Sequence, residues 1–414
     1  MWFRVHIGVP EVRRLGSDVE YSVRYSLGNG GRFLGDNERA LGDSDSSLCY
    51  RVPAEYEEMV SPRADAALVA LLIPAMVAGG ELHVEGPVSD ELAFRLRHGY
   101  QDVLQAVIPA LRSVEVIAHQ QVPPEPRRTG VATGFSAGVD SFTVLADHFY
   151  DPEVSPTFKV THLLFNRVGS HDDAGDAERA LFLDRFDRAS RVADKIGLPF
   201  IAVDTNVMDA YRGTGLNYQQ THTPRNASVA FLLQRGVGRW LFASALHIRH
   251  TRVAKFYDTT LTDPVSLPLL STSSLLLESH GGQYTRFDKT MRIAEIPDTY
   301  SSLDVCVSGT LGPNCSKCFK CLRTLVTLEI GGALDRYEDV FDLDVYRRHR
   351  DTYLALARLS RDPIVKELVV EARSRGFALP RPSLRRVSPT VYRHAKGEAI
   401  RHGEQLLKKL RATE

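Results

Sequence analysis

Residues 131–145, VATGFSAGVDSFTVL, decide the fold of the central part of this chain. A short apolar run comes first, then a turn with two glycines, then apolar residues at helical spacing. This order predicts a buried strand, a sharp turn and a helix. In a parallel α/β sheet, ligands bind beyond the carboxyl ends of the strands, where the following helix offers backbone N–H groups to phosphate. The stretch therefore predicts a phosphate-binding turn.

The turn SAGVDS supplies residue types that suit the phosphates of a nucleotide. Gly138 lets the backbone approach the phosphates without a side chain in the way. The hydroxyls of Ser136 and Ser141 can donate hydrogen bonds, and Asp140 can hold the magnesium ion that accompanies a nucleotide. The turn is neither a Walker loop nor the dinucleotide G-x-G-x-x-G. The predicted nucleotide-binding residues here are Ser136, Ala137, Gly138, Val139, Asp140 and Ser141.

Sequence patterns around this stretch predict three parts. Residues 129–331 alternate strand and helix patterns, which is typical of a parallel sheet covered on both faces. Residues 1–128 mix strand and helix patterns and predict a small α+β domain. The proline-containing run 121–130 reads as the linker between these two parts. Residues 332–414 predict a basic helical region.

Composition points to a cytoplasmic globular protein. The chain has 414 residues, 43% hydrophobic and 25% charged, and a formal net charge of +0. Its longest apolar stretch, residues 66–80, is too short to span a bilayer and contains Pro74, so it predicts a buried helix and no membrane partner. The first residues lack the pattern of a secretory signal. The tail from Arg373 is basic; it is either a solvated helix or a contact for a macromolecule.

Four of the five cysteines fall in one window, CVSGTLGPNCSKCFKC, with the spacing C-x8-C-x2-C-x2-C. This spacing brings four thiolates around one ion, and in a reduced cytosol tetrahedral structural zinc is the expected occupant. An iron–sulfur cluster is the alternative. The predicted metal ligands are Cys306, Cys315, Cys318 and Cys321.

Two further motifs follow the turn. THTPRNASVAFLL places Arg225 and Asn226 after a proline and at the predicted start of a helix, where a guanidinium can clamp phosphate or a carboxylate. The second motif, RFDKTMRIAEI, lies further along the chain and contains Lys289. Asn166, at a predicted strand end, is a further candidate nucleotide contact.

The motifs and their order resemble the PP-loop ATP pyrophosphatase superfamily and, within it, the 7-cyano-7-deazaguanine synthases. SAGVDS is similar to the S-G-G-x-D-S loop that binds the pyrophosphate end of ATP, with Ala137 in place of a glycine. The resemblance covers about 200 residues and implies a PP-loop core. We expect Ala137 to lie in the helical backbone region, where its methyl costs little. A Tyr-Pro-Asp-Cys-Arg run of the family is absent, so its substrate does not carry over.

The resemblance implies an ATP-dependent ligase that adenylates a substrate carboxylate, deazaguanine-like or related, releases pyrophosphate and then forms an amide or nitrile. It assigns catalysis to Asp140, Arg225 and Lys289, with magnesium, and makes Lys289 a candidate phosphate ligand. A macromolecular acceptor, protein or nucleic acid, could bind the N-terminal domain or the basic tail. Relatives occur in antiphage operons, so antiphage defence, or a nucleoside- or protein-modification pathway, is the expected setting.

Two other functions compete with the ligase. A tRNA-thiolating PP-loop enzyme needs a persulfide-bearing cysteine outside the metal set, and Cys49 is the one available. A degenerate PP-loop used as a binding module would explain Ala137. In the segment after residue 244, four polar residues could read the substrate or simply face solvent: His247, Arg249, Asp258 and Asp263.

Overall fold

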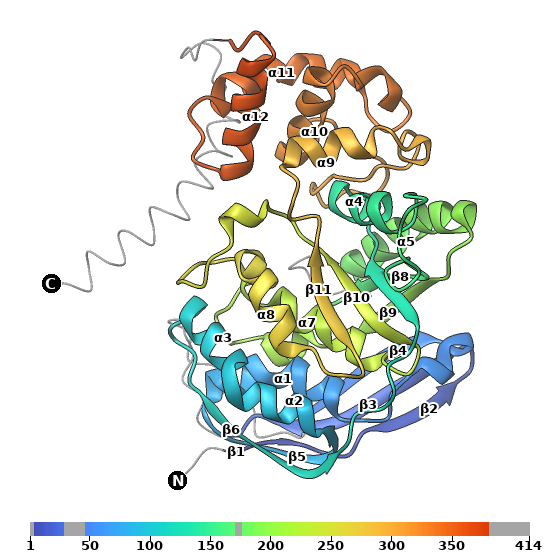
Figure 1. The fold of residues 1–414 in the computed structure, drawn as a ribbon, viewed down its shortest axis with the longest axis vertical. Helices are drawn as coiled ribbons and strands as arrows, with labels where there is room; N and C mark the ends of the chain where they lie inside the picture. Colours follow the sequence, from blue (N-terminus) through green and yellow to red (C-terminus); the bar gives the residue numbers. More distant parts are fainter. Residues whose placement is uncertain (1–3, 29–45, 170–175, 381–414) are drawn as a thin grey trace, which may run out of the picture. The chain divides into compact units, whose positions relative to one another are not determined.

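The computed structural model describes residues 4–28, 46–169 and 176–380 (Figure 1). Internal contacts divide the chain into two compact units. Unit 1 consists of Met1–Thr285, Ser302–Asp304 and Gly309–Gly312, and unit 2 consists of Arg286–Ser301, Val305–Ser308 and Pro313–Glu414. Within the described ranges, every helix is too short or too polar to cross a membrane.

Unit 1 is an α/β structure built on an 11-stranded sheet. Five of its strands are parallel and lie side by side in the order β11-β10-β7-β8-β9. They are β7 (Gly130–Gly134), β8 (His162–Arg167), β9 (Phe200–Thr205), β10 (Val237–Ala243) and β11 (Leu276–His280). The helices between them include α4 (Val139–His148), α5 (Asp176–Ile196), α6 (Met208–Tyr211), α7 (Tyr218–Leu232) and α8 (Asp263–Leu270). The predicted α/β class with a parallel sheet is confirmed.

The strand order reverses at β7. From β7 the chain moves to β8 and β9 on one side, and then returns to β10 on the other side of β7. At such a switch point, two consecutive crossovers leave in opposite directions, so the carboxyl ends of β7 and β10 flank the place where parallel sheets bind ligands. The turn that follows β7 is SAGVDS.

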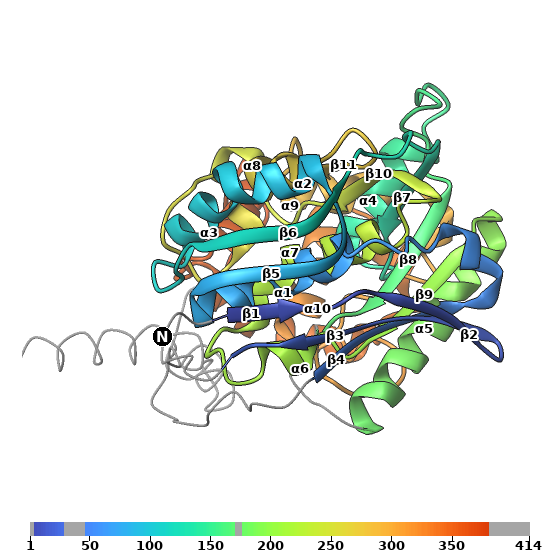
Figure 2. The same cartoon turned by 90° about the horizontal axis from the view of Figure 1, so that it is seen from below.

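The remaining strands extend the same sheet (Figure 2). They are β1 (Arg4–Ile7), β2 (Glu11–Leu15), β3 (Asp18–Ser26), β4 (Ser46–Pro53), β5 (Gly80–Ser89) and β6 (Val114–Val122). β4 pairs antiparallel with β9, through Tyr50 opposite Thr205 and Arg51 opposite Asp204. The boundary predicted near residue 128 therefore falls inside unit 1, because backbone pairing continues across it.

Helix α1 (Asp65–Ala78) belongs to the N-terminal part of unit 1 and packs against the part that contains the five parallel strands. Each of its residues is buried, as its uninterrupted apolar sequence predicts. It packs on α7, and the hydroxyl of Tyr211 donates to the carbonyl of Ala70 at 2.8 Å. Pro74 lies inside the helix.

The helical segment that follows β5 is interrupted. The structure has α2 (Asp90–Arg95), a π-turn, and α3 (Gln101–Val107). Gly99 adopts φ 111, a conformation that breaks the regular helical hydrogen-bond ladder. Ser89 is the N-cap of α2, but its side chain makes no capping hydrogen bond.

Unit 2 is helical and contains α9 (Arg286–Ile293), α10 (Phe319–Ile330), α11 (Leu343–Ala357) and α12 (Pro363–Ser374). Arg350 of α11 donates from Nε to Glu329 of α10 at 2.7 Å. α9 and α10 precede residue 332 yet contact α11 and α12, so the boundary predicted near 331 also falls inside a unit. Residues 381–414, which hold most of the predicted basic tail, lie outside the described residues.

Candidate functional site

The SAGVDS turn connects β7 to α4, as the sequence predicts. Gly138 is the N-cap of α4. The hydroxyl of Ser141 accepts from the backbone N–H of Gly138 at 3.1 Å and donates to the carbonyl of Gly138 at 3.1 Å. Ser141 is buried and braces the turn itself, whereas Ser136 is exposed and Asp140 is half-buried. The turn thus presents the N-terminus of α4, a place that favours anions, at the switch point of the sheet.

Ala137 does not lie in the helical region, so that expectation is wrong. Its φ is 54°, in the left-handed region where an L side chain costs about 1–2 kcal/mol. The backbone is held there because the N–H of Asp304 donates to the carbonyl of Ala137 at 2.8 Å. Glycine would adopt this conformation without strain.

Replacing Ala137 by glycine is therefore expected to relieve this strain. Loss of the buried methyl and the added freedom of the unfolded chain offset part of the gain, so we expect the free energy of unfolding to rise by about 0.5 kcal/mol. Ala146→Gly, in the last turn of α4, is the control and should lower it by about 1–2 kcal/mol. Urea unfolding measures both. If Ala137→Gly lowered the free energy of unfolding as much as the control does, the result would contradict strain at Ala137.

Arg225 lies inside a helix rather than before one. α7 begins at Tyr218 because Asn217 and Gln220 form a capping box, so Pro224 and Arg225 fall in its second turn. The side chain of Arg225 is buried, at 1% exposure. Its guanidinium stacks over the Tyr211 ring at 3.8 Å and donates to the carbonyl of Val168 at 3.4 Å. Val168 follows β8, so the guanidinium reaches the carboxyl edge of the sheet.

Asn166 and Asn226 come together, although 60 residues separate them. Nδ2 of Asn166, on β8, donates to Oδ1 of Asn226, on α7, at 3.2 Å. Nδ2 of Asn226 donates to the backbone carbonyl of His222 at 2.9 Å. Two of the predicted nucleotide contacts thus share one place at the carboxyl end of β8.

Lys289 lies in α9 of unit 2 and is buried, at 1% exposure. The turn belongs to unit 1. The role of Lys289 toward phosphate therefore stays a prediction.

The four predicted metal ligands converge in unit 2. The sulfur atoms of Cys306, Cys315, Cys318 and Cys321 all lie within 4.8 Å of one another. A tetrahedral ion with bonds of about 2.3 Å to sulfur holds its ligands about 3.8 Å apart, so this spacing fits a metal ion. These four cysteines could hold a metal ion, as the spacing predicts.

Backbone geometry arranges the cysteines. Cys318 is the N-cap of α10, and its sulfur accepts from the N–H of Cys321 at 3.5 Å. Ser316 adopts φ 57, which turns the chain so that the N–H of Cys318 reaches the sulfur of Cys315 at 3.3 Å. Such N–H to sulfur bonds stabilise thiolates, the form that binds metal.

The charges of the four sulfurs also call for a cation. Hydrogen bonds from Cys318 and Cys321 lower the pKa of the Cys306 thiol far below its usual range. Side-chain hydrogen bonds to Cys306 and Cys318, together with burial, raise the pKa of the Cys321 thiol. A bound cation favours the ionised form of each thiol that coordinates it.

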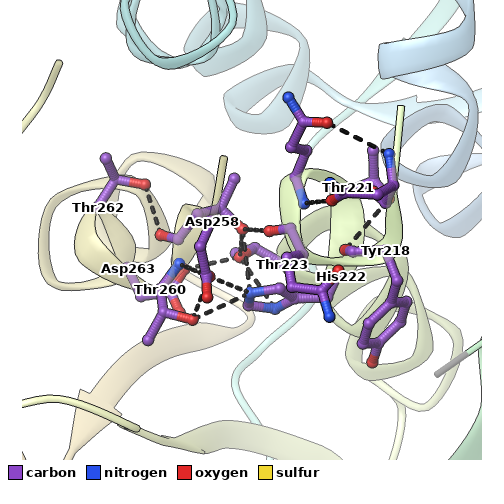
Figure 3. A network of polar contacts seen from close by, with 12 residues as sticks. Tyr218, Thr221, His222, Thr223, Asp258, Thr260, Thr262 and Asp263 are labelled. Atoms are coloured by element: carbon purple, nitrogen blue, oxygen red, sulfur yellow. Dashed lines mark hydrogen bonds and ion pairs between the residues drawn. The ribbon is translucent and has the colours of Figure 1, made fainter. Parts of the chain in front are cut away.

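A polar cluster around His222 was not predicted as a unit (Figure 3). Nε2 of His222, on α7, lies 3.5 Å from Oδ1 of Asp258 and 3.2 Å from the hydroxyl of Thr260. The hydroxyl of Thr223 donates to Asp263 at 2.7 Å. The sequence singles out Asp258 and Asp263 as candidates, but His222 carries no local signal that would link it to them.

The other candidates of the segment after β10 make local contacts. The Nδ1 atom of His247 accepts from the backbone N–H of Arg249 at 3.0 Å. Ser244, which directly follows β10, donates from its hydroxyl to the carbonyl of Leu246 at 2.8 Å in the same loop. These bonds shape the loop itself.

The arrangement offers an anion-binding helix N-terminus at the switch point, a set of four thiols for a metal ion, and a histidine between two carboxylates. Comparison with models of known protein families gives no match, and comparison with curated proteins gives none either.

Proposed function

We propose that this protein is an ATP-dependent C–N ligase of the PP-loop class, which forms AMP and pyrophosphate. In this proposal a substrate carboxylate attacks the α-phosphorus of ATP, pyrophosphate leaves, and an amine then attacks the acyl-adenylate. The carboxylate is deazaguanine-like or related, and the setting is antiphage defence or nucleoside or protein modification in the cytoplasm.

The position of the SAGVDS turn carries this proposal. The turn follows β7 at the reversal of strand order and leads into the N-terminus of α4. Strands β9-β8-β7-β10-β11 follow the order 3-2-1-4-5 that nucleotide-binding sheets share. A pyrophosphate group suits this place, because backbone N–H groups and the helix dipole both favour negative charge.

The other candidate residues are proposed to have separate roles in the reaction. Asp140, in the first turn of α4, is the candidate magnesium ligand. Arg225, Asn166 and Asn226 meet at the carboxyl end of β8, where they could bind the nucleotide or the carboxylate. Lys289 remains the candidate second cation for phosphate. Positioning and charge neutralisation supply most of the rate enhancement in such reactions.

We further propose that zinc is the ion held by the four cysteines. Among the described residues, the group that could hold the ion consists of four cysteine sulfurs, which matches structural zinc sites that keep no open coordination position. Bound zinc would stabilise unit 2 and take no part in the reaction.

A binding module is the second candidate function, and the strained Ala137 favours it. The S-G-G-x-D-S loop has glycine at this position, where a positive φ costs glycine nothing. Ala137 stands there at a positive φ, which indicates that the sequence is no longer constrained to keep an unstrained phosphate-binding loop. In that case nucleotide binds without turnover. The thiolation alternative depends on Cys49, and a Cys49→Ser variant with full activity would exclude it.

The test is pyrophosphate release from ATP and magnesium by the wild-type chain, with 7-carboxy-7-deazaguanine and ammonia added or withheld. Release that requires the carboxylate supports the ligase and its deazaguanine-like substrate. Pyrophosphate release without 7-carboxy-7-deazaguanine supports adenylation of another acceptor. It excludes a requirement for 7-carboxy-7-deazaguanine. ATP binding with no release under any condition, in protein that retains its metal, contradicts the ligase and supports the binding module.

A further inference from the structure

The cluster around His222 lies at the same edge of the sheet as the SAGVDS turn. Phe242, near the carboxyl end of β10, stacks on the His222 ring with centroids 5.9 Å apart and planes 5° apart. β10 is the neighbour of β7 at the switch point. The backbone carbonyl of His222 is held by Asn226, which also bonds Asn166 on β8. The histidine is thereby fixed beside the ends of the central strands.

The ring of His222 is enclosed by groups that act on its charge. Asp258 faces it from the loop before the short turn η4 (Thr259–Leu261), Asp263 from α8, and Tyr218 and Arg225 from its own helix. Burial disfavours the charged ring, but the hydrogen bond to Asp258 and the charge of Asp263 outweigh it, so the pKa of His222 is raised. A base with a pKa near the working pH is the most effective proton acceptor.

Asp258 connects the buried ring to solvent. Its side chain is 30% exposed, whereas that of His222 is 11% exposed. Thr260 fixes the carboxylate, because its hydroxyl and its backbone N–H both donate to Oδ1 of Asp258, at 2.6 and 2.9 Å. The bond to His222 lowers the pKa of Asp258, so this carboxylate stays ionised. A proton that arrives at Asp258 therefore passes to Nε2 of His222.

Asp263 is the fully buried carboxyl group of the cluster. One of its carboxylate oxygens accepts from Thr223 at 2.7 Å. In the part of the chain that the structure describes, its other oxygen has no hydrogen-bond partner. Burial raises the pKa of Asp263 to about 6. Such a carboxylate is most stable when a positive charge forms beside it, which protonation of His222 provides.

We propose that the His222–Asp258 pair accepts the proton released when an amine attacks the acyl-adenylate. This inference rests on the proposed function and adds the acid–base group of its second step. The amine nitrogen forms a bond to the acyl carbon, the bond from that carbon to the phosphate oxygen breaks, and AMP leaves with the electron pair. The proton lost by the nitrogen moves through Asp258 to Nε2 of His222, and the AMP phosphate keeps its charge.

The experiment separates the two steps. Exchange of labelled pyrophosphate into ATP, with 7-carboxy-7-deazaguanine as the probe carboxylate, measures adenylation. Single-turnover product formation measures transfer, with ammonia as the probe amine at a constant concentration of the free base, between about pH 6 and 9 to span the range of histidine titration. The variants are His222→Gln and Asp258→Asn, and His250→Gln is the control, since His250 follows the same strand but lies outside the cluster.

We expect His222→Gln to keep its exchange rate and to lose about 100-fold in transfer, the scale of general base catalysis. In the wild type, transfer rises with pH as His222 loses its proton. Asp258→Asn removes the bond that raises this pKa, so the rise should move to lower pH. Retained exchange shows that the variants are folded.

Two kinds of result would overturn the role. Transfer that is unchanged in His222→Gln, or a pH profile that does not move in Asp258→Asn, rules out proton acceptance by the pair. Parallel loss of exchange and transfer in both variants gives the cluster a structural role instead. A wild-type chain without exchange contradicts the proposed function itself, and the acid–base role with it.

Discussion

Replacing Cys321 by serine is expected to release the metal ion and to unfold unit 2. The side chain of Cys321 is fully buried in α10, and its sulfur lies 3.4 Å from that of Cys318. A serine hydroxyl does not ionise near neutral pH, so the ion would lose one of four charged ligands. Structural zinc contributes about 10–16 kcal/mol of binding free energy in small zinc domains. That exceeds or matches the roughly 5–15 kcal/mol that stabilises a typical folded domain.

Elemental analysis and thermal unfolding measure this effect together. The wild type should hold about one zinc ion per chain, and Cys321→Ser close to none. The control is Cys49→Ser, because Cys49 lies in β4 of unit 1 and outside the cluster. It should keep both the metal and the unfolding temperature. Metal content that is equal in the two variants would contradict the site, and iron in place of zinc would identify the alternative cluster.

Asp140→Asn is expected to lower pyrophosphate release by about 100-fold, the usual cost of losing one group that stabilises charge in a transition state. The asparagine keeps the size and the helical position of the side chain but removes its negative charge. Magnesium binding weakens as a result, so the concentration of magnesium needed for half-maximal release should rise.

Asp147→Asn is the matched control, since Asp147 lies in the same helix and accepts from Tyr284 and Gln283 instead. Release rates at several magnesium concentrations, with circular dichroism to show equal folding, compare the two variants. Equal activity of Asp140→Asn and the wild type would remove Asp140 from the site. Equal loss in both variants would indicate a general effect on α4.

The sequence by itself determined the features that depend on neighbouring residues. Apolar runs, the glycine of the turn and the helical spacing after it predict β7, the SAGVDS turn and α4, because these signals act within a few residues. The spacing of Cys315, Cys318 and Cys321 likewise brings three sulfurs together on one turn and one helix start. Cys306 joins them from nine residues away.

Only the tertiary structure decided the features that depend on distant segments. The pairing of β4 with β9 makes one sheet of two predicted domains, and edge pairing leaves no mark in a local pattern. The bond from Asp304 fixes Ala137 at a positive φ against its own preference. His222 and Asp258 meet because α7 and the loop after β10 converge near one strand end, and this contact raises the pKa of His222 and lowers that of Asp258. The sequence determines which ionisable groups are present, whereas long-range packing determines their contacts and their pKa values.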